Sequence, residues 1–211
     1  MRTDIFLRDF AWQLILNNGI DKLPVDVVKL AENLGIGLVT YGELTKIMTI
    51  SFEEVKRKYG DRAFCFISSF FLNICAYNET MPEPLMRWAV MHEIAHIALG
   101  HVTKQRRLLS YRNRTDALER EAQGVARRVL CPSIILHECN AVEVEEIMTL
   151  CGISREAAQY RSEYIKVLEK RKKFETSMLE TKVKMQFENF IKRTKMHSKF
   201  EFAEELLLEI A

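Results

Sequence analysis

Apolar residues recur at two different spacings along the first half of the chain, and the spacing predicts the element. Residues 5–16 carry them at the period of a helix, and a second helical stretch follows Pro24 and ends at Gly35. The segment GIGLVTYG, with glycines at both ends, predicts a short strand. Two β-rich apolar runs, RAFCFISSF and FLNICAYN, predict two more strands, and the turn-like NETMPEP closes the second.

The second half of the chain has helical spacing almost throughout. PLMRWAVMHEIAHIALG predicts a helix from Pro84 to about Gly100, and another runs from about Asp116 to Leu130. VEEIMTLCGISREAAQY has the pattern of two helices joined by a turn at a glycine. A few strands followed by helices is the order of an α+β fold. We therefore expect a small mixed or antiparallel sheet packed on a helical core.

The composition of the chain changes past about Glu169. The stretch KRKKFETSMLETKVKMQFENFIKRTKMHSKFEF is highly charged, contains no glycine or proline, and is only sparsely apolar. It predicts a long exposed helix or a mobile tail, ending in the short amphipathic AEELLLEIA. We therefore predict one folded domain over residues 1–168 and a charged helical extension over residues 169–211. A docking arm for a partner chain is an alternative use of this extension.

Overall composition narrows the class of protein. With 211 residues, 48% hydrophobic and 28% charged, the chain has the profile of a globular domain with one substantial core. A net charge of +2 is too small to indicate nucleic acid or an anionic membrane as the partner. Acids and amides interrupt the apolar N-terminus, so we expect no signal peptide, and no apolar run is long enough to span a bilayer.

Five cysteines are scattered along the sequence and form no CxxC pair. Most stand in apolar runs such as FCFIS and NICAY, where a free thiol behaves as a small core residue. A disulfide framework is therefore not expected, and a reducing cytoplasm is the expected compartment.

The segment HEIAHIALGH carries the clearest chemistry. His92 and His96 are four residues apart on a helix, so both imidazoles project from one face, about one turn apart. At this spacing two nitrogens can hold one Zn²⁺ at about 2.0–2.1 Å. Glu93 is placed to accept a proton from water at the metal. The alternative is a core helix whose histidines are satisfied by their neighbours.

Catalytic zinc needs three protein ligands and an open position, so a third ligand must come from elsewhere. His101 follows His96 by five residues, whereas the metzincin arrangement needs six, so we expect it to cap carbonyls at the helix end instead. Glu119 and Glu121 lie two apart on the next helix, so only one can face the metal. Glu119 shares a helix face with small residues and is favoured as the third ligand, whereas Glu121 is expected nearer solvent. For either glutamate the alternative is an exposed salt bridge on the helix.

The run RWAVMHEIAHIALGH followed by ALEREAQGVARRVLCP resembles the ImmA/IrrE family of zinc metallopeptidases, and the resemblance covers roughly residues 20–168. In that family an HExxH helix precedes a helix of the form E-x-[EQ]-A-[ND]-x-[FV]-A, and the family's third zinc ligand falls on Glu119. The resemblance thus implies a zincin-like core of the gluzincin type. This chain departs from the family pattern at two positions. Gln123 stands where the family has an Asn or Asp that could orient a ligand histidine, and glutamine can still accept such a hydrogen bond on a longer side chain. Val125 stands where a bulkier aromatic residue is common.

Together these features predict a zinc-dependent endopeptidase with Zn²⁺ as cofactor. The expected ligands are His92, His96 and Glu119, and Glu93 is the expected general base. The oxyanion would sit on zinc with help from a further donor, for which the candidates are Tyr111, His101 and Arg114.

We expect a peptide substrate to lie extended along the edge of the FLNICAYN strand. The family resemblance implies that the substrate is a regulatory protein, such as a helix–turn–helix transcriptional repressor of a mobile element or a stress response. The sequence leaves open the cleavage site, the trigger and the oligomeric state.

A different class of function rests on the two helices within VEEIMTLCGISREAAQY. This passage has the look of a DNA-binding helix–turn–helix, with Arg155, Gln159 and Arg161 on the second helix. The chain would then be a zinc-stabilised DNA-binding or protein-interaction regulator without peptidase activity. Glu156 and Glu163 on the same helix argue against contact with DNA.

Overall fold

The computed structural model describes residues 2–103, 108–109 and 114–196 of the chain. Its architecture is α+β, as predicted, with one small mixed sheet and helices before, within and after it. The described helices are α1 Asp4–Asn17, α2 Val27–Asn33, α3 Tyr41–Met48, α4 Phe52–Tyr59, α5 Glu83–Ala98, α6 Asp116–Leu130, α7 Ser133–Glu138, α8 Val144–Cys151, α9 Arg155–Lys170 and α10 Met178–Gln186. The strands are β1 Gly37–Thr40, β2 Ala63–Ile67, β3 Asn73–Tyr77 and β4 Leu108–Leu109.

The strands follow the order β1-β3-β2-β4. β3 pairs with β1 in parallel and with β2 antiparallel, while β4 pairs with β2 at Cys65 and Phe66. β3 therefore lies inside the sheet and has no free edge. The expectation that a substrate lies along the edge of the FLNICAYN strand is wrong for this reason.

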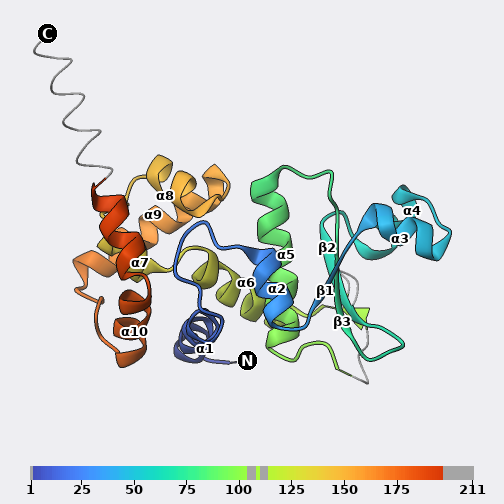
Figure 1. Ribbon diagram of the computed structural model, residues 1–211, viewed down its shortest axis with the longest axis horizontal. Coiled ribbons are helices and arrows are strands. Elements are labelled where there is room, and N and C mark those ends of the chain that lie inside the picture. Colours follow the sequence, from blue (N-terminus) through green and yellow to red (C-terminus); the bar gives the residue numbers. More distant parts are fainter. Residues whose placement is uncertain (1, 104–107, 110–113, 197–211) are drawn as a thin grey trace, which may run out of the picture.

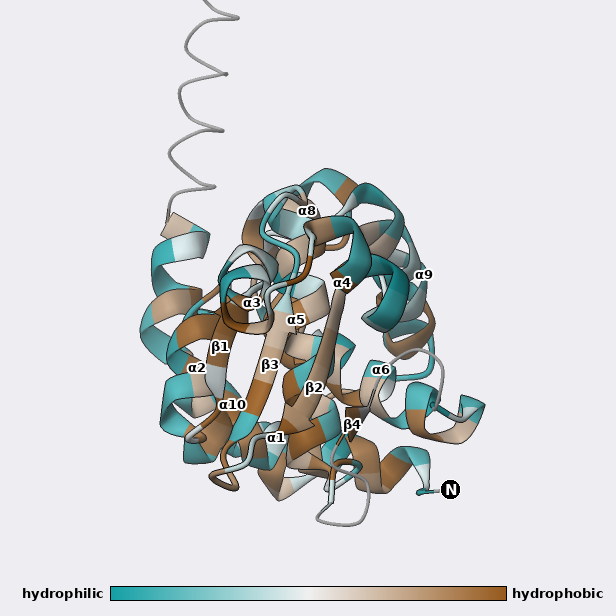
Figure 2. Ribbon diagram, turned by 90° about the vertical axis from the view of Figure 1, so that its right-hand side faces the viewer, coloured by the Kyte–Doolittle hydropathy of each residue, from teal (hydrophilic) through white to brown (hydrophobic). Residues whose placement is uncertain are grey.

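Different helices pack on the two faces of the sheet. Figure 1 shows the sheet between α5 on one side and α3 and α4 on the other. Side chains alternate between the faces of a strand. Phe64 therefore packs with Tyr41 and Val55 in a small core under α3 and α4, whereas Cys75 joins the main core. In Figure 2 the strands are largely apolar and α4 is mostly hydrophilic.

Helices α3 and α4 were not foreseen from apolar spacing, although their start signals are in the sequence. α3 begins with a capping box in which Thr40 and Glu43 bond each other's backbone amides, and α4 begins with the same device at Ser51 and Glu54. Each helix has only eight residues, too few to establish a periodic pattern. The short helix α7 was missed for the same reason.

The main core joins the helices before and after the sheet. α6 packs against both α1 and α5, and the fully buried side chains include Ile15, Met91, Ile94 and Leu130. At Gly124 a Cβ atom would lie 3.1 Å from Cδ1 of Leu7, so α1 and α6 approach each other closely there. This packing fixes α5 and α6 side by side, which positions the site described below.

The segment after residue 168 is helical, as predicted, but it is not a single exposed helix. α10 packs against α1 and α7, and Val183, Phe187 and Ile191 are buried in the main core. The side-chain amide of Gln186 donates to the carbonyl oxygens of Ile15 and Ile20. The expectation of an exposed helix or tail is therefore wrong for residues 178–191. The boundary at residue 168 stays a prediction, and AEELLLEIA lies outside the described residues.

Two expectations drawn from composition can be compared with the structure. All five cysteines are free and buried, which confirms their interpretation as core thiols. Within the described ranges, none of the helices combines the length and the apolar character needed to cross a membrane.

Candidate metal centre

Helix α5 carries two histidines and a glutamate into the interior. It begins after Pro82, with a second proline in its first turn, where a missing amide costs little. Its residues 89–96 are all buried, including His92, Glu93 and His96. Helix α6 begins at Thr115, whose side chain accepts from the amide of Leu118, and Glu119 lies in its first turn. Packing of α6 on α5 brings Glu119 to the two histidines.

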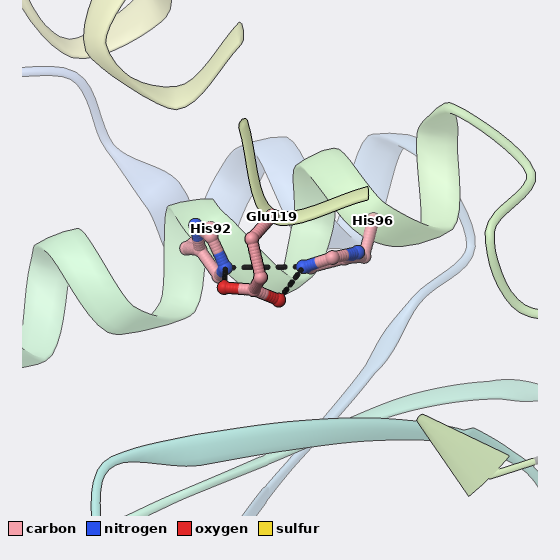
Figure 3. A group of neighbouring side chains, drawn as sticks. All are labelled: His92, His96 and Glu119. Carbon is pink, nitrogen blue, oxygen red and sulfur yellow. Dashed lines mark hydrogen bonds and ion pairs between the residues drawn. The ribbon is translucent and has the colours of Figure 1, made fainter. Parts of the chain in front are cut away.

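Three side chains converge at this contact, as Figure 3 shows. Nε2 of His92 lies 3.1 Å from Oε2 of Glu119, and Nε2 of His96 lies 3.1 Å from Oε1 of the same carboxylate. The two Nε2 atoms are 3.0 Å apart. Among the residues that the structure describes, this is the group of histidine, cysteine and acidic side chains that could hold a metal ion, with one ligand atom from each within 4.8 Å.

The protonation states of these groups suit a divalent cation. Burial lowers the pKa of His96, which keeps its ring neutral with a free lone pair. Burial alone would raise the pKa of Glu119, but the hydrogen bonds from His92 and His96 and the charge of Arg114 hold it well below its ordinary value. Two imidazoles and one carboxylate are a donor set that zinc accepts, so the residues present fit this metal.

A buried chain of polar groups supports His96 from behind. Its Nδ1 lies 2.8 Å from Nδ1 of His101, and Nε2 of His101 lies 3.2 Å from Oε2 of Glu121. Arg2 donates to both oxygens of Glu121, from its backbone amide and from Nη1, each over 2.7 Å. Burial, followed by the proximity of His96, lowers the pKa of His101 to about 4. His96 is thus oriented by a network of three further residues.

This network corrects two expectations. The ring of His101 does not cap α5; Nη2 of Arg2 does so, donating to the carbonyl oxygen of Leu99 over 2.9 Å. Glu121 is only 4% exposed rather than near solvent, because it points toward His101 and Arg2. No sequence signal could have found Arg2, which lies 119 residues from Glu121.

Glu93 lies beside the three converging side chains and is 2% exposed. Its Oε2 accepts from Nη2 of Arg114 over 2.5 Å, and Nη1 of Arg114 lies 3.4 Å from Oε1 of Glu119. Burial alone would lower the pKa of Arg114, but the charge of Glu93 and the hydrogen bond to it raise the pKa of Arg114 overall. Of the three donors considered for an oxyanion, the structure brings Arg114 to Glu93 and His101 behind His96. Tyr111 lies outside the described residues.

Gln123, one of the two residues that depart from the family pattern, is exposed on α6 and lines a surface cleft together with His92. It makes no hydrogen bond to His92 in the part of the chain that the structure describes. Nδ1 of His92 is buried and has no hydrogen-bond partner there. The idea that Gln123 orients a histidine therefore stays a prediction.

An open cleft of about 700 Å³ lies over this group. One wall is formed by residues 59–63, at the end of α4 and the start of β2, and the other by α5 and α6. Trp88, His92, Glu93 and Glu119 line it. An extended chain could therefore reach the converging side chains and Glu93 from outside.

The family model described as the IrrE N-terminal-like domain, peptidase family M78, matches residues 46–163. The chain belongs to this peptidase family. The match runs from the end of α3 into α9 and so includes all of α5 and α6, and it confirms the ImmA/IrrE resemblance read from the sequence. No curated protein sequence matches the chain. Family membership supports metallopeptidase chemistry and hence a protein substrate.

Proposed function

We propose that this protein is a zinc-dependent endopeptidase, with His92, His96 and Glu119 as metal ligands and Glu93 as the general base. The observation that carries the proposal is the convergence of three ligand atoms beside a buried glutamate on the wall of an open cleft. When bound, Zn²⁺ supplies Lewis-acid chemistry, polarising a carbonyl oxygen and lowering the pKa of water to about 7.

Two side chains beside the metal position, Glu93 and Arg114, supply proton transfer and positive charge. Glu93 accepts the proton of the attacking water at a carboxylate oxygen and delivers it to the leaving amine. Arg114 holds Glu93 through its Nη2 contact and brings a positive charge close to the place where the scissile carbonyl gains negative charge. Burial of Glu93 removes competing water from the proton transfer.

The substrate path follows the cleft rather than β3. Residues 59–63 and the first turns of α5 border it, so an extended peptide would pass the start of β2 as it crosses the metal position. Family resemblance favours a regulatory protein such as a helix–turn–helix repressor of a mobile element as the target. A target of that kind would place the reaction in the cytoplasm.

The proposal is tested by separating zinc binding from cleavage. Purified protein should contain one zinc per chain and should cut a candidate repressor at a defined bond, as measured by metal analysis and mass spectrometry. Glu93→Gln should retain zinc but lose cleavage by roughly 10²–10⁴-fold, because the general base is gone. Unchanged cleavage by this variant at full zinc content would refute the assignment of Glu93.

The DNA-binding alternative is less well supported by the contacts of α9. Arg161 is only 4% exposed, donates to the carbonyl oxygen of Cys131 and lines a recessed pocket, so it does not project from the outer surface of α9 as a residue that reads a DNA groove must. Arg155 pairs with Glu145 over 2.7 Å. DNA retention that depends on salt and is lost in Arg155→Ala would revive this alternative.

A further inference from the structure

A second pocket, of about 510 Å³, continues the cleft along α5 toward α9. The two cavities share Arg62, Trp88 and Gln123, so a peptide lying over the metal position can extend into the second without leaving the surface. Trp88 stands one turn before His92 on α5, between the two cavities. The walls come from α5, α6 and the first two turns of α9.

The lining of this pocket combines apolar surface with an excess of positive charge. Leu85, Trp88 and Ile153 supply apolar surface. Three arginines, Arg62, Arg127 and Arg161, face a single acid, Glu156. We call this cavity the arginine pocket.

None of the three arginines forms an ion pair with a carboxylate in the described residues. Arg127 instead donates through Nη1 to the hydroxyl of Tyr160 over 3.2 Å, and its guanidinium lies 5.8 Å from the centre of that ring. Elsewhere on the molecule, arginines with close carboxylate partners are common, as with Arg87 and Glu83 at 2.6 Å. The arginines of the pocket therefore have no close carboxylate partner in the part of the chain that the structure describes, and Glu156 offsets only one of the three charges.

Arg161 is the most informative of the three. It is 4% exposed, its Nη2 donates to the carbonyl oxygen of Cys131, and its Nε is buried without a hydrogen-bond partner. Burial lowers its pKa, which reflects the cost of holding this charge away from water. A buried charge without a counter-charge is stabilised by any anion that reaches it. The N-terminus of the 16-residue helix α9, at Ser154, adds a favourable dipole at the same pocket.

We propose that the arginine pocket is a specificity subsite that binds an aspartate or glutamate side chain of the peptide substrate, within a few residues of the scissile bond. This inference rests on the proposed peptidase function. The apolar lining would hold the methylene stem and the arginines would bind the carboxylate by charge-assisted hydrogen bonds.

The test begins with cleavage specificity. Zinc-loaded protein is incubated with a mixture of peptides from a digested proteome, and the cut sites are identified by mass spectrometry. Aspartate and glutamate should be enriched at one fixed position from the cut. A matched pair of peptides, acetylated and amidated at the ends and differing only in Glu or Gln at that position, should then differ roughly tenfold in kcat/KM.

Variants locate this preference in the pocket. Arg62→Gln and Arg127→Gln should each reduce the Glu-over-Gln ratio of kcat/KM severalfold, with the larger loss falling on cleavage of the Glu peptide. Both side chains are at least partly exposed, so these variants should fold. Arg155→Gln is the matched control, because it removes the same charge from the start of α9 outside the pocket, and it should leave the ratio unchanged.

The outcomes separate this inference from the function on which it rests. Cleavage by the wild type without any preference for acidic residues would overturn the subsite and leave the peptidase intact. Absence of cleavage by zinc-loaded protein would count against the peptidase. In that case binding of capped hexapeptides that contain Glu or Gln is compared through the fluorescence of Trp88 in a Trp12→Phe background. Equal affinities would overturn the subsite, and tighter binding of the Glu peptide, lost in Arg127→Gln, would support it.

Discussion

His92 and His96 project from the same face of α5, one turn apart, but their rings are held in different ways. His96 is fully buried and its Nδ1 contacts His101, which continues to Glu121 and Arg2. Nδ1 of His92 has no hydrogen-bond partner in the described residues. One ring is therefore oriented by a hydrogen-bonded network, whereas in the described residues the other is held by packing and by contacts of its Nε2 with Glu119 and His96.

The rigidity of the site comes from the residues behind His96. Partners behind a ligating histidine fix its orientation and its tautomer, and they raise metal affinity by roughly 10–100-fold. The network behind His96 ends on Arg2, which also caps the last turn of α5 at Leu99. The same side chain thus anchors the end of the helix and one ligand, while the His92 side opens to the cleft.

The largest difference is expected on removing each histidine. His92→Ala and His96→Ala should both abolish stoichiometric zinc binding, measured by metal analysis, because two ligands are too few for a tight site. The metal-free proteins should differ in stability. His96→Ala should lower the free energy of unfolding by about 2–3 kcal/mol, since it leaves a cavity and leaves Nδ1 of His101 without its partner in the interior. His92→Ala should lower it by only about 1 kcal/mol in the same urea titration. Equal losses would refute the asymmetry.

The free energy of unfolding of the metal-free protein should depend on pH. The folded-state pKa of His101 is about 4 and that of His96 is also lowered, against an ordinary value of 6.5. Between these pH values the unfolded chain binds more protons than the folded chain, so stability is fully present above pH 6.5 and falls as pH drops toward 4. Metal-free protein should lose roughly 2–3 kcal/mol over this window, as followed by urea unfolding. His101→Gln should flatten the curve, and an unchanged curve in this variant would contradict the assignment.

Third, the network itself can be weakened without touching a ligand. His101→Ala should reduce zinc affinity about 10–100-fold in competition with a chelator, because His96 loses the group that orients it. Glu121→Gln should have a smaller effect in the same direction, since an amide can still accept from His101. Gln123→Ala, on the exposed side of α6, serves as the control and should change affinity little. An effect of Gln123→Ala as large as that of His101→Ala would mean that the two ligands are supported equally.

The smallest effect is expected from giving Nδ1 of His92 a hydrogen-bond partner, which it does not have among the described residues. Gln123→Asp places a shorter, charged acceptor on the face of α6 that lines the cleft beside His92. Zinc affinity should rise severalfold, because a carboxylate that accepts a hydrogen bond from a ligating histidine fixes its ring and raises its basicity. No gain, with an unchanged fold by circular dichroism, would indicate that the side chain at residue 123 cannot reach the ring.

Much of the fold and part of the candidate site could be predicted from the sequence. Helix α6 begins at Asp116 and ends at Leu130 as expected, because a threonine cap and a Cys-Pro stop are local signals. The helix face with small residues favoured Glu119 over Glu121, the family motif strengthened that preference, and the structure groups Glu119 with His92 and His96, while its role as a ligand stays a proposal. β3 as an inner strand, Glu121 as a buried residue and Phe187 as a core residue could not be predicted, because each depends on which distant element packs against it.

The sequence by itself determined the spacing of His92, Glu93 and His96, since residues four apart on a helix must share a face. It also determined the α+β order of elements and, through an extended motif, the family. Only the tertiary structure decided that Arg2 and Glu121 stand behind His96 and that Arg114 reaches Glu93. It also decided that three arginines, with no carboxylate partner among the described residues, line the continuation of the cleft. Periodicity fixes the direction of a side chain from its own helix, but the partner that it meets is set by long-range packing of apolar faces, which carries no local signal.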